Sequence, residues 1–311
     1  MPEITRRKAK DTITVVEILH GDILEFTRLD GTLCVFKLNK TGARIVNTTL
    51  KTPGICENGA RTIYTFWAEV TIDGKEHRLE RIVGTQDSFY EPWVIAGLRI
   101  WLDAVDDIFT FLEETHGSCG LGGLFSADRP PRYHARFAIQ DYMARICPDL
   151  LHIWCPIPEK TLRIEDCYRG EDCWLGAFAG ASAHAGIDIN HPARTPLYAP
   201  IDLDNQFYFN SIATGHKNNR WRGTRRWNNG AEWILQAHHM TSLLVEEHTP
   251  LKRGQHYAEG AGVWSGGVDH SHFEFKIHDY GVTMPLDPWI LFWQMYQDMD
   301  RGKSLCSHGK G

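Results

Sequence analysis

Two Asp-Gly steps in the first third of the chain constrain its fold more than any other feature. Asp30-Gly31 and Asp73-Gly74 each lie between two short runs that are rich in Val, Ile, Phe and Thr. Asp-Gly is a strong signal for a tight hairpin, because both turn residues need a positive φ. An antiparallel β domain is therefore predicted, and its role is expected to be structural or in binding because it holds no cluster of catalytic residue types. The predicted strands are Thr12–Leu19, Asp22–Leu29, Leu33–Leu38, Arg61–Ile72 and Glu76–Val83.

Three helices are predicted after these strands. Apolar residues recur at spacings of three and four over residues 98–112, and a second helix is expected at Ala135–Ile146. The glycine-rich segment 117–123 between them lacks the Gly-Lys-Ser/Thr ending of a phosphate-binding loop and is interpreted as a linker. Asp287-Pro288 opens a terminal helix, with Asp as the N-cap and Pro in the first turn.

The fold class that follows is mainly β with a few helices (α+β). Residues 1–116 are expected to form an antiparallel β domain with a trailing helix, and residues 117–150 a linker and a helix. Residues 151–311 are expected to form a second antiparallel β domain that ends in the terminal helix.

Composition narrows the functional classes. The formal net charge is −6, from 33 basic and 39 acidic residues, which argues against a general nucleic-acid binder. No apolar run is long enough for a membrane span, and no signal peptide is visible at the start. None of the eight cysteines forms a Cys-x-x-Cys pair, which disfavours a thiolate zinc site and leaves disulfides or buried thiols open. The 16 histidines favour a metal site or acid–base chemistry.

Three histidine motifs lie beyond residue 180. His184 and Asp188 are four residues apart, His238 and His239 are adjacent, and His270 and His272 flank one serine, Ser271. On a strand, His270 and His272 point to the same face, whereas His238 and His239 point to opposite faces, so at most one of the latter pair is expected to face a given site. A polar, solvated strand face is the other interpretation of a His-x-His pair. Two imidazoles with a carboxylate can bind zinc and leave a fourth position for water.

The order and surroundings of these motifs resemble the lysostaphin-type (LytM-like) zinc metallopeptidases, a family of glycyl-glycine and peptidoglycan cross-bridge endopeptidases. The likeness extends over Thr195–Asp202, His239–Val245 and Leu251–Gln255, so that it covers about residues 180–280 and not the first 150. Two departures stand out. Segment Leu203–Glu232 is unusually long, and Ala237 replaces an aromatic residue two positions before His239.

The resemblance implies a zinc-dependent hydrolase that cleaves an amide in a cell-wall peptide. The zinc ligands would be His184, Asp188 and His272, and the catalytic histidines would be His239 and His270. Peptidoglycan or another cell-wall peptide or glycan would be the partner, and a location outside the cytoplasm would follow.

The long segment and one nearby tryptophan suggest a substrate groove. Aromatic rings can stack on sugars or peptides, and arginines can bind carboxylates. A solvated loop, a nucleic-acid surface and, for Trp264, a core position are the other interpretations. Two further functions stay open: a zinc lyase or hydrolase that acts on an acidic polysaccharide, and a non-catalytic glycan-binding protein with a structural zinc. The expected groove residues are Trp221, Arg222, Trp227 and Trp264.

Overall fold

The structure, a computed structural model, describes residues 2–112, 130–151, 154–155, 172–212, 215, 217–262 and 268–299. The chain divides into two compact units, the first formed by Met1–Pro148 with Leu175–Ala185 and the second by Asp149–Trp174 with Gly186–Gly311. The predicted glycine-rich linker at 117–123 lies outside the described residues. No helix in the described ranges is both long and apolar enough to cross a membrane.

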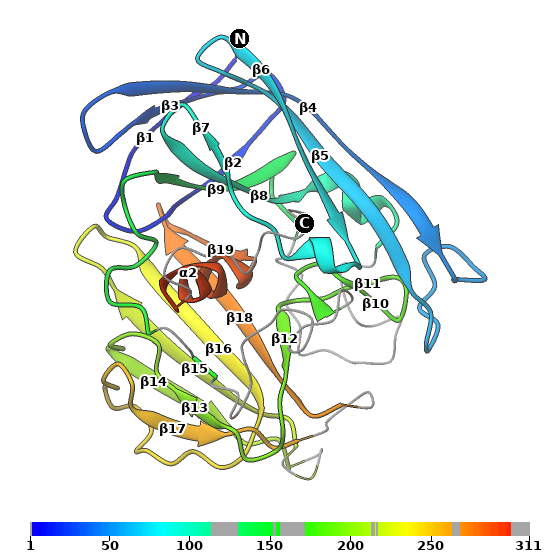
Figure 1. The fold of residues 1–311 in the computed structure, drawn as a ribbon, viewed down its shortest axis with the longest axis vertical. Helices are drawn as coiled ribbons and strands as arrows, with labels where there is room; N and C mark the ends of the chain where they lie inside the picture. Colours follow the sequence, from blue (N-terminus) through cyan, green and yellow to red (C-terminus); the bar gives the residue numbers. More distant parts are fainter. Residues whose placement is uncertain are drawn as a thin grey trace. The chain divides into compact units, whose positions relative to one another are not determined.

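The first unit consists of β-sheets (Figure 1). A five-stranded sheet has the order β1-β3-β4-β5-β6, a four-stranded sheet has the order β2-β9-β8-β7, and β10 pairs with β11. The larger sheet is antiparallel except that β1 runs parallel to β3. The strands are β1 (Ile4–Lys8), β2 (Thr14–Ile18), β3 (Ile23–Thr27), β4 (Leu33–Thr48), β5 (Thr62–Ile72), β6 (Lys75–Val83), β7 (Trp93–Ile95), β8 (Leu98–Val105), β9 (Ala135–Asp141), β10 (Ala177–Phe178) and β11 (Ser182–Ala183), and the 3-10 turns are η1 (Gln86–Ser88) and η2 (Asp106–Thr110).

The predicted hairpin at Asp73-Gly74 is confirmed, since φ is +47° at Asp73 and +79° at Gly74. At Asp30-Gly31 only the glycine has a positive φ, +86°, and the loop closes through a hydrogen bond from the Arg28 amide to the Thr32 carbonyl. The two main sheets pack on each other through Phe36 of β4 and Phe137 of β9, whose ring centroids lie 5.0 Å apart.

Two of the three predicted helices are wrong. Residues 98–112 form strand β8 followed by the 3-10 turn η2, and Ala135–Ile146 begins with strand β9. Seven of the eight residues of β8 and all seven of β9 are buried, so neither strand alternates between apolar and polar residues. In a strand that is covered on both faces, apolar and polar residues do not alternate with a period of two. Its apolar residues can then match a helical spacing by chance.

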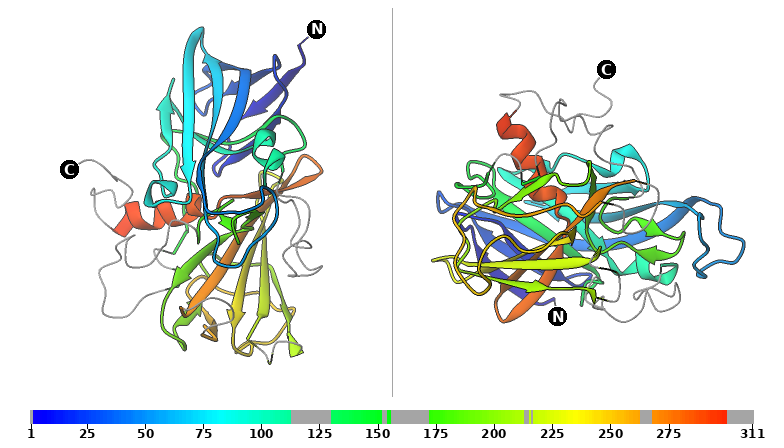
Figure 2. Two further views of the ribbon diagram at one scale, coloured as in Figure 1. Left: turned by 90° about the vertical axis from the view of Figure 1, so that its right-hand side faces the viewer. Right: turned by 90° about the horizontal axis from the view of Figure 1, so that it is seen from below.

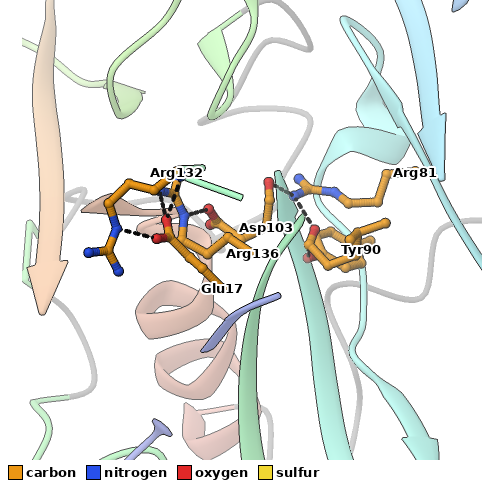
Figure 3. Close-up of polar contacts among 7 residues, drawn as sticks. Glu17, Arg81, Tyr90, Asp103, Arg132 and Arg136 are labelled. Carbon is orange, nitrogen blue, oxygen red and sulfur yellow. Dashed lines mark hydrogen bonds and ion pairs between the residues drawn. The ribbon is translucent and has the colours of Figure 1, made fainter. Parts of the chain in front are cut away.

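Charged side chains inside the first unit added to this error. Arg136 of β9 donates from Nε to Oδ2 of Asp103 on β8 at 2.7 Å, and its Nη1 lies 3.2 Å from Oε1 of Glu17 on β2 (Figure 3). Arg132 closes the cluster with a 2.6 Å bond from Nε to Oε2 of Glu17. Asp103 and Arg136 are fully buried, so these two charged residues form an ion pair inside the protein and do not belong to a solvated helix face.

The second unit is built around a six-stranded sheet, which Figure 2 shows from two further sides. The strand order is β12-β18-β16-β15-β14, and β19 pairs with the second half of β18. Strands β13 and β17 form a separate pair. The elements are β12 (Ile187–Asn190), β13 (Pro196–Tyr198), β14 (Asn205–Phe209), β15 (Asn219–Arg226), β16 (Glu232–Met240), β17 (His256–Glu259), β18 (His270–Asp279), β19 (Val282–Leu286) and the helix α2 (Trp289–Met299).

One face of this sheet is apolar and covered. Phe273 of β18 packs against Phe292 of α2 at 5.6 Å between ring centroids, and Trp221 of β15 stacks on Tyr257 of β17 at 4.2 Å. The predicted terminal helix is confirmed, and Oδ1 of Asp287 accepts a hydrogen bond from the amide of Trp289 at 2.9 Å, as an N-cap does. The opposite face of the sheet carries the polar side chains described next.

Candidate metal centre and acid–base histidines

Asp188 and His272 meet across neighbouring strands. They are register partners on β12 and β18, and Oδ1 of Asp188 lies 2.8 Å from Nδ1 of His272. Gly186, just before β12, permits this approach. A Cβ atom there would lie 2.1 Å from the carbonyl oxygen of Phe273 and 2.8 Å from Nε2 of His272, which is closer than real Cβ atoms come. Only a residue without a side chain fits at this position, so Gly186 is needed for β12 to lie this close to His272.

Two of the three proposed ligands, Asp188 and His272, meet within this sheet. Ligand atoms that share a zinc ion at about 2.0–2.2 Å lie on the order of 3–4 Å from one another, so the 2.8 Å between these two atoms is close to the separation that a shared ion requires. The third, His184, lies four residues before Asp188, in the stretch Leu175–Ala185 of the first unit. Two imidazole nitrogens and one carboxylate oxygen fit zinc, and three protein ligands leave a coordination position open.

His270 is oriented by its own backbone neighbourhood. Its Nδ1 lies 2.9 Å from the carbonyl oxygen of Val268. Because a carbonyl only accepts, Nδ1 carries the proton and donates it, and Nε2 of neutral His270 is left as a base. That Nε2 lies 3.9 Å from Oδ2 of Asp188, beside the candidate metal ligands. The ring is therefore set in the tautomer that can accept a proton at the site.

His239 reaches the same place by an unusual backbone conformation. Its φ is +59°, in the left-handed region that non-glycine residues rarely adopt. Its ring centroid lies 4.9 Å from that of His270 and 6.2 Å from that of His272. Burial and, next, the nearby His270 hold the pKa of His239 well below its ordinary range, so the ring is neutral at pH 7. Backbone strain of this kind is concentrated at functional sites.

The expectation that only one of His238 and His239 faces the site is wrong. His238 is the register partner of His272, and their ring centroids are 4.8 Å apart. Side chains of paired residues in an antiparallel sheet share a face, so His238 lies beside His272. The positive φ at His239 breaks the alternation and turns the second ring toward the same region.

Glu274 supports His272 from the side away from Asp188. Its Oε1 lies 3.5 Å from Nε2 of His272 and 3.5 Å from Nε2 of His238, and the ammonium of Lys276 lies 3.6 Å from its Oε2. Although burial raises the pKa of Glu274, the hydrogen bond with His272 and the charges of His238 and Lys276 hold it well below the usual range. Burial lowers the pKa of His272, but hydrogen bonds with Asp188 and Glu274 outweigh it and raise that pKa to about 9.

Sequence reasoning missed His191, which fixes the strand that carries the His-x-His pair. Nε2 of His191 lies 2.8 Å from the hydroxyl of Ser271, and its Nδ1 lies 2.9 Å from the carbonyl of Pro192. Ser271 is fully buried between the two site histidines. The sequence signal for such a partner is Ser271 itself. It is a polar residue on the strand face that also carries Phe273 and Phe275 into the core, so its hydroxyl needs a hydrogen-bond partner there.

The four expected groove residues separate into different environments. Trp221 is 1% exposed and stacks on Tyr257, so its assignment to a groove wall is corrected to a core position. Trp227 is half-buried and packs edge-on against Trp233 at 5.2 Å. Arg222 is exposed on the polar face of the sheet, and Trp264 lies outside the described residues.

No protein-family model and no curated protein matches the chain. Among solved structures it is similar to lysostaphin in solution, with 20% identity, a TM-score of 0.28 and coverage of 34% of this chain and 42% of that one. It is also similar to a variant catalytic domain of the prophage-encoded M23 protein EnpA from Enterococcus faecalis, with 21% identity, a TM-score of 0.27 and coverage of 34% and 76%. A zinc-containing peptidase from Vibrio cholerae gives 13% identity, a TM-score of 0.30 and coverage of 74% and 80%.

The chain thus spans less than half of the lysostaphin chain. With TM-scores of 0.27 to 0.30, these likenesses support no conclusion about this chain, and its function has to be inferred from the residues of the site. The expected β-rich fold with few helices is confirmed.

Proposed function

We propose that the chain is a zinc-dependent hydrolase that cleaves an amide bond in a peptide, most readily a cell-wall peptide. The observation that carries this proposal is the meeting of two kinds of group at one end of one sheet. Asp188 and His272 offer metal ligands 2.8 Å apart, and the rings of His239 and His270, whose centroids lie 4.9 Å from each other, stand beside them.

His184, Asp188 and His272 would hold the zinc ion. Bound zinc supplies a Lewis acid that lowers the pKa of water toward neutrality and polarises a carbonyl group. Glu274 orients His272 through its Nε2 and leaves Nδ1 turned toward Asp188. Residues that fix a ligand ring in this way preserve its tautomer and its position.

The two remaining histidines would move protons. Nε2 of His270 is positioned to accept a proton from the attacking water, because its Nδ1 proton is held by the Val268 carbonyl. His239, neutral and buried next to it, would donate a hydrogen bond from its N–H to the oxyanion, and the proton that His270 takes from water would pass to the leaving amine. A structural zinc site usually has four protein ligands, so this arrangement favours catalysis over a purely structural role.

Digestion of purified peptidoglycan tests the bond that is cleaved. We expect new amino termini and hydrolysis products 18 Da heavier per cut, read by mass spectrometry, since hydrolysis adds one water. In a parallel digest of a uronate polymer, the products of a lyase would instead carry a new carbon–carbon double bond and no added water. Such products, without new amino termini, would replace the peptidase proposal by the polysaccharide alternative. The Asp188→Ala protein is the matched control for contaminating hydrolases.

A further inference from the structure

The polar face of the six-stranded sheet continues well beyond the candidate metal centre. Register places Asp188, His272, His238, Arg220 and Phe209 in one row across five strands. The next row along the sheet holds four more register partners. They are Glu274, Gln236, Arg222 and Phe207.

The second row is linked by hydrogen bonds that point toward Arg222. Nε2 of Gln236 donates to Oε2 of Glu274 at 2.9 Å, which turns Oε1 of Gln236 toward β15. Nε of Arg222 then donates to that oxygen at 3.0 Å. Gln236 and Glu274 are buried, whereas Arg222 is exposed. One edge of the guanidinium is therefore fixed by the protein, while Arg222 as a residue remains exposed.

Arg222 differs from its neighbours on the same strand in its charge environment. Arg226 pairs with Glu232 at 2.8 Å, and Arg225 lies 3.8 Å from Asp204. Within the described part of the chain, no ion pair joins Arg222 to a carboxylate. The nearest acid in its row, Glu274, already has Lys276 and two histidines around it.

Two exposed aromatic rings border the arginines on the side away from the metal centre. Phe207 is 47% exposed and pairs with Arg222, and Phe209 is 45% exposed and pairs with Arg220. Exposed phenylalanines beside an arginine offer an apolar wall next to a planar, doubly donating cation. That combination suits a carboxylate attached to a peptide backbone.

We propose that Arg222 binds a carboxylate of the peptide substrate, so that the enzyme selects peptides with an acidic group at a fixed distance from the cleaved bond. This inference rests on the proposed peptidase function, because that function places the scissile amide at the metal centre and so defines where Arg222 lies along the substrate. From β18 to β15 is two strand spacings, about 10 Å across the sheet, and an extended peptide rises about 3.3 Å per residue. The carboxylate would therefore lie roughly two to four residues from the scissile amide.

Peptide pairs that differ only in charge test the proposal. Synthetic hexapeptides of Gly and Ala with blocked termini carry one Asp, or the uncharged isostere Asn, at each position in turn. At one position two to four residues from the cut, wild-type protein is expected to have a kcat/KM about 10-fold higher for the Asp peptide. The Arg222→Gln variant is expected to lose this preference through KM.

Arg226→Gln is the matched control, because it makes the same change on the same strand at an arginine that already has a partner. It should keep the preference for Asp. Equal rates of wild-type protein on Asp and Asn peptides, or an unchanged preference in Arg222→Gln, would overturn the proposed carboxylate site. Neither result would contradict the proposed hydrolase function. Arg222-dependent binding of oligouronates in place of acidic peptides would overturn the peptide assignment.

Calorimetric titration of the same peptides separates the two proposals. Arg222-dependent binding of the Asp peptide, with no hydrolysis of any peptide, would support the carboxylate site and contradict the proposed peptidase. Hydrolysis without any dependence on Arg222 would support the peptidase and contradict the carboxylate site.

Discussion

Replacing His270 with alanine is expected to lower the turnover number by about 10²–10⁴ while zinc remains bound. The imidazole has its Nδ1 proton engaged by the Val268 carbonyl, so the base that faces the site is Nε2. It is not a member of the proposed ligand set His184, Asp188 and His272, so its loss would remove a proton acceptor and leave the proposed metal ligands in place. Turnover and zinc content measured on one preparation separate the two effects.

His239 is expected to behave in the same way. The substitution His239→Asn is preferable to alanine, because asparagine tolerates the φ of +59° at this position. His278→Ala is the matched control for both variants. His278 is an exposed histidine on β18, on the same face as His270 and eight residues after it. A His270→Ala protein without zinc, or full activity in both site variants, would contradict the assigned roles.

Adding one methyl group at Gly186 is expected to disable the site. In Gly186→Ala the new Cβ would lie 2.1 Å from a backbone oxygen of β18 and 2.8 Å from Nε2 of His272, so β12 and β18 must separate. Overpacking of this kind costs about 1–3 kcal/mol in the free energy of unfolding. Because the displaced groups include His272, we expect zinc affinity and activity to fall at least 10-fold. Isothermal titration with zinc and a denaturation curve measure the two losses.

Ala193→Ser is the matched control for this variant, because it adds one non-hydrogen atom at an exposed position in the loop after β12. It should retain zinc affinity, activity and stability. A Gly186→Ala protein that binds zinc as tightly as the wild type would show that the strands are not held as closely as the structure places them.

The fold was predictable where local signals dominate. The hairpin at Asp73-Gly74 and the N-capped terminal helix follow from residues that act on their own backbone. Strands β8 and β9 were mistaken for helices, because both of their faces are buried and their charged residues pair inside the protein. That burial depends on the neighbouring sheet, which no local window of sequence contains.

The site shows the same division. The spacing of His270 and His272 on a strand predicted their shared face, and the register with β12 and β16 agrees with it. The joint presence of His238 and His239 at the site was not predictable, because it depends on one left-handed residue. The burial of Trp221 depends on β17, a strand that lies more than 30 residues further along the chain.

Zinc content and peptide hydrolysis, measured together before and after chelation, test the central claim most directly. The account predicts about one zinc per chain in the purified protein, loss of hydrolysis when a chelator removes it, and recovery when zinc is returned. His272→Ala should neither retain zinc nor recover. Stoichiometric zinc in His272→Ala, or peptide hydrolysis that continues in metal-free wild-type protein, would contradict the account.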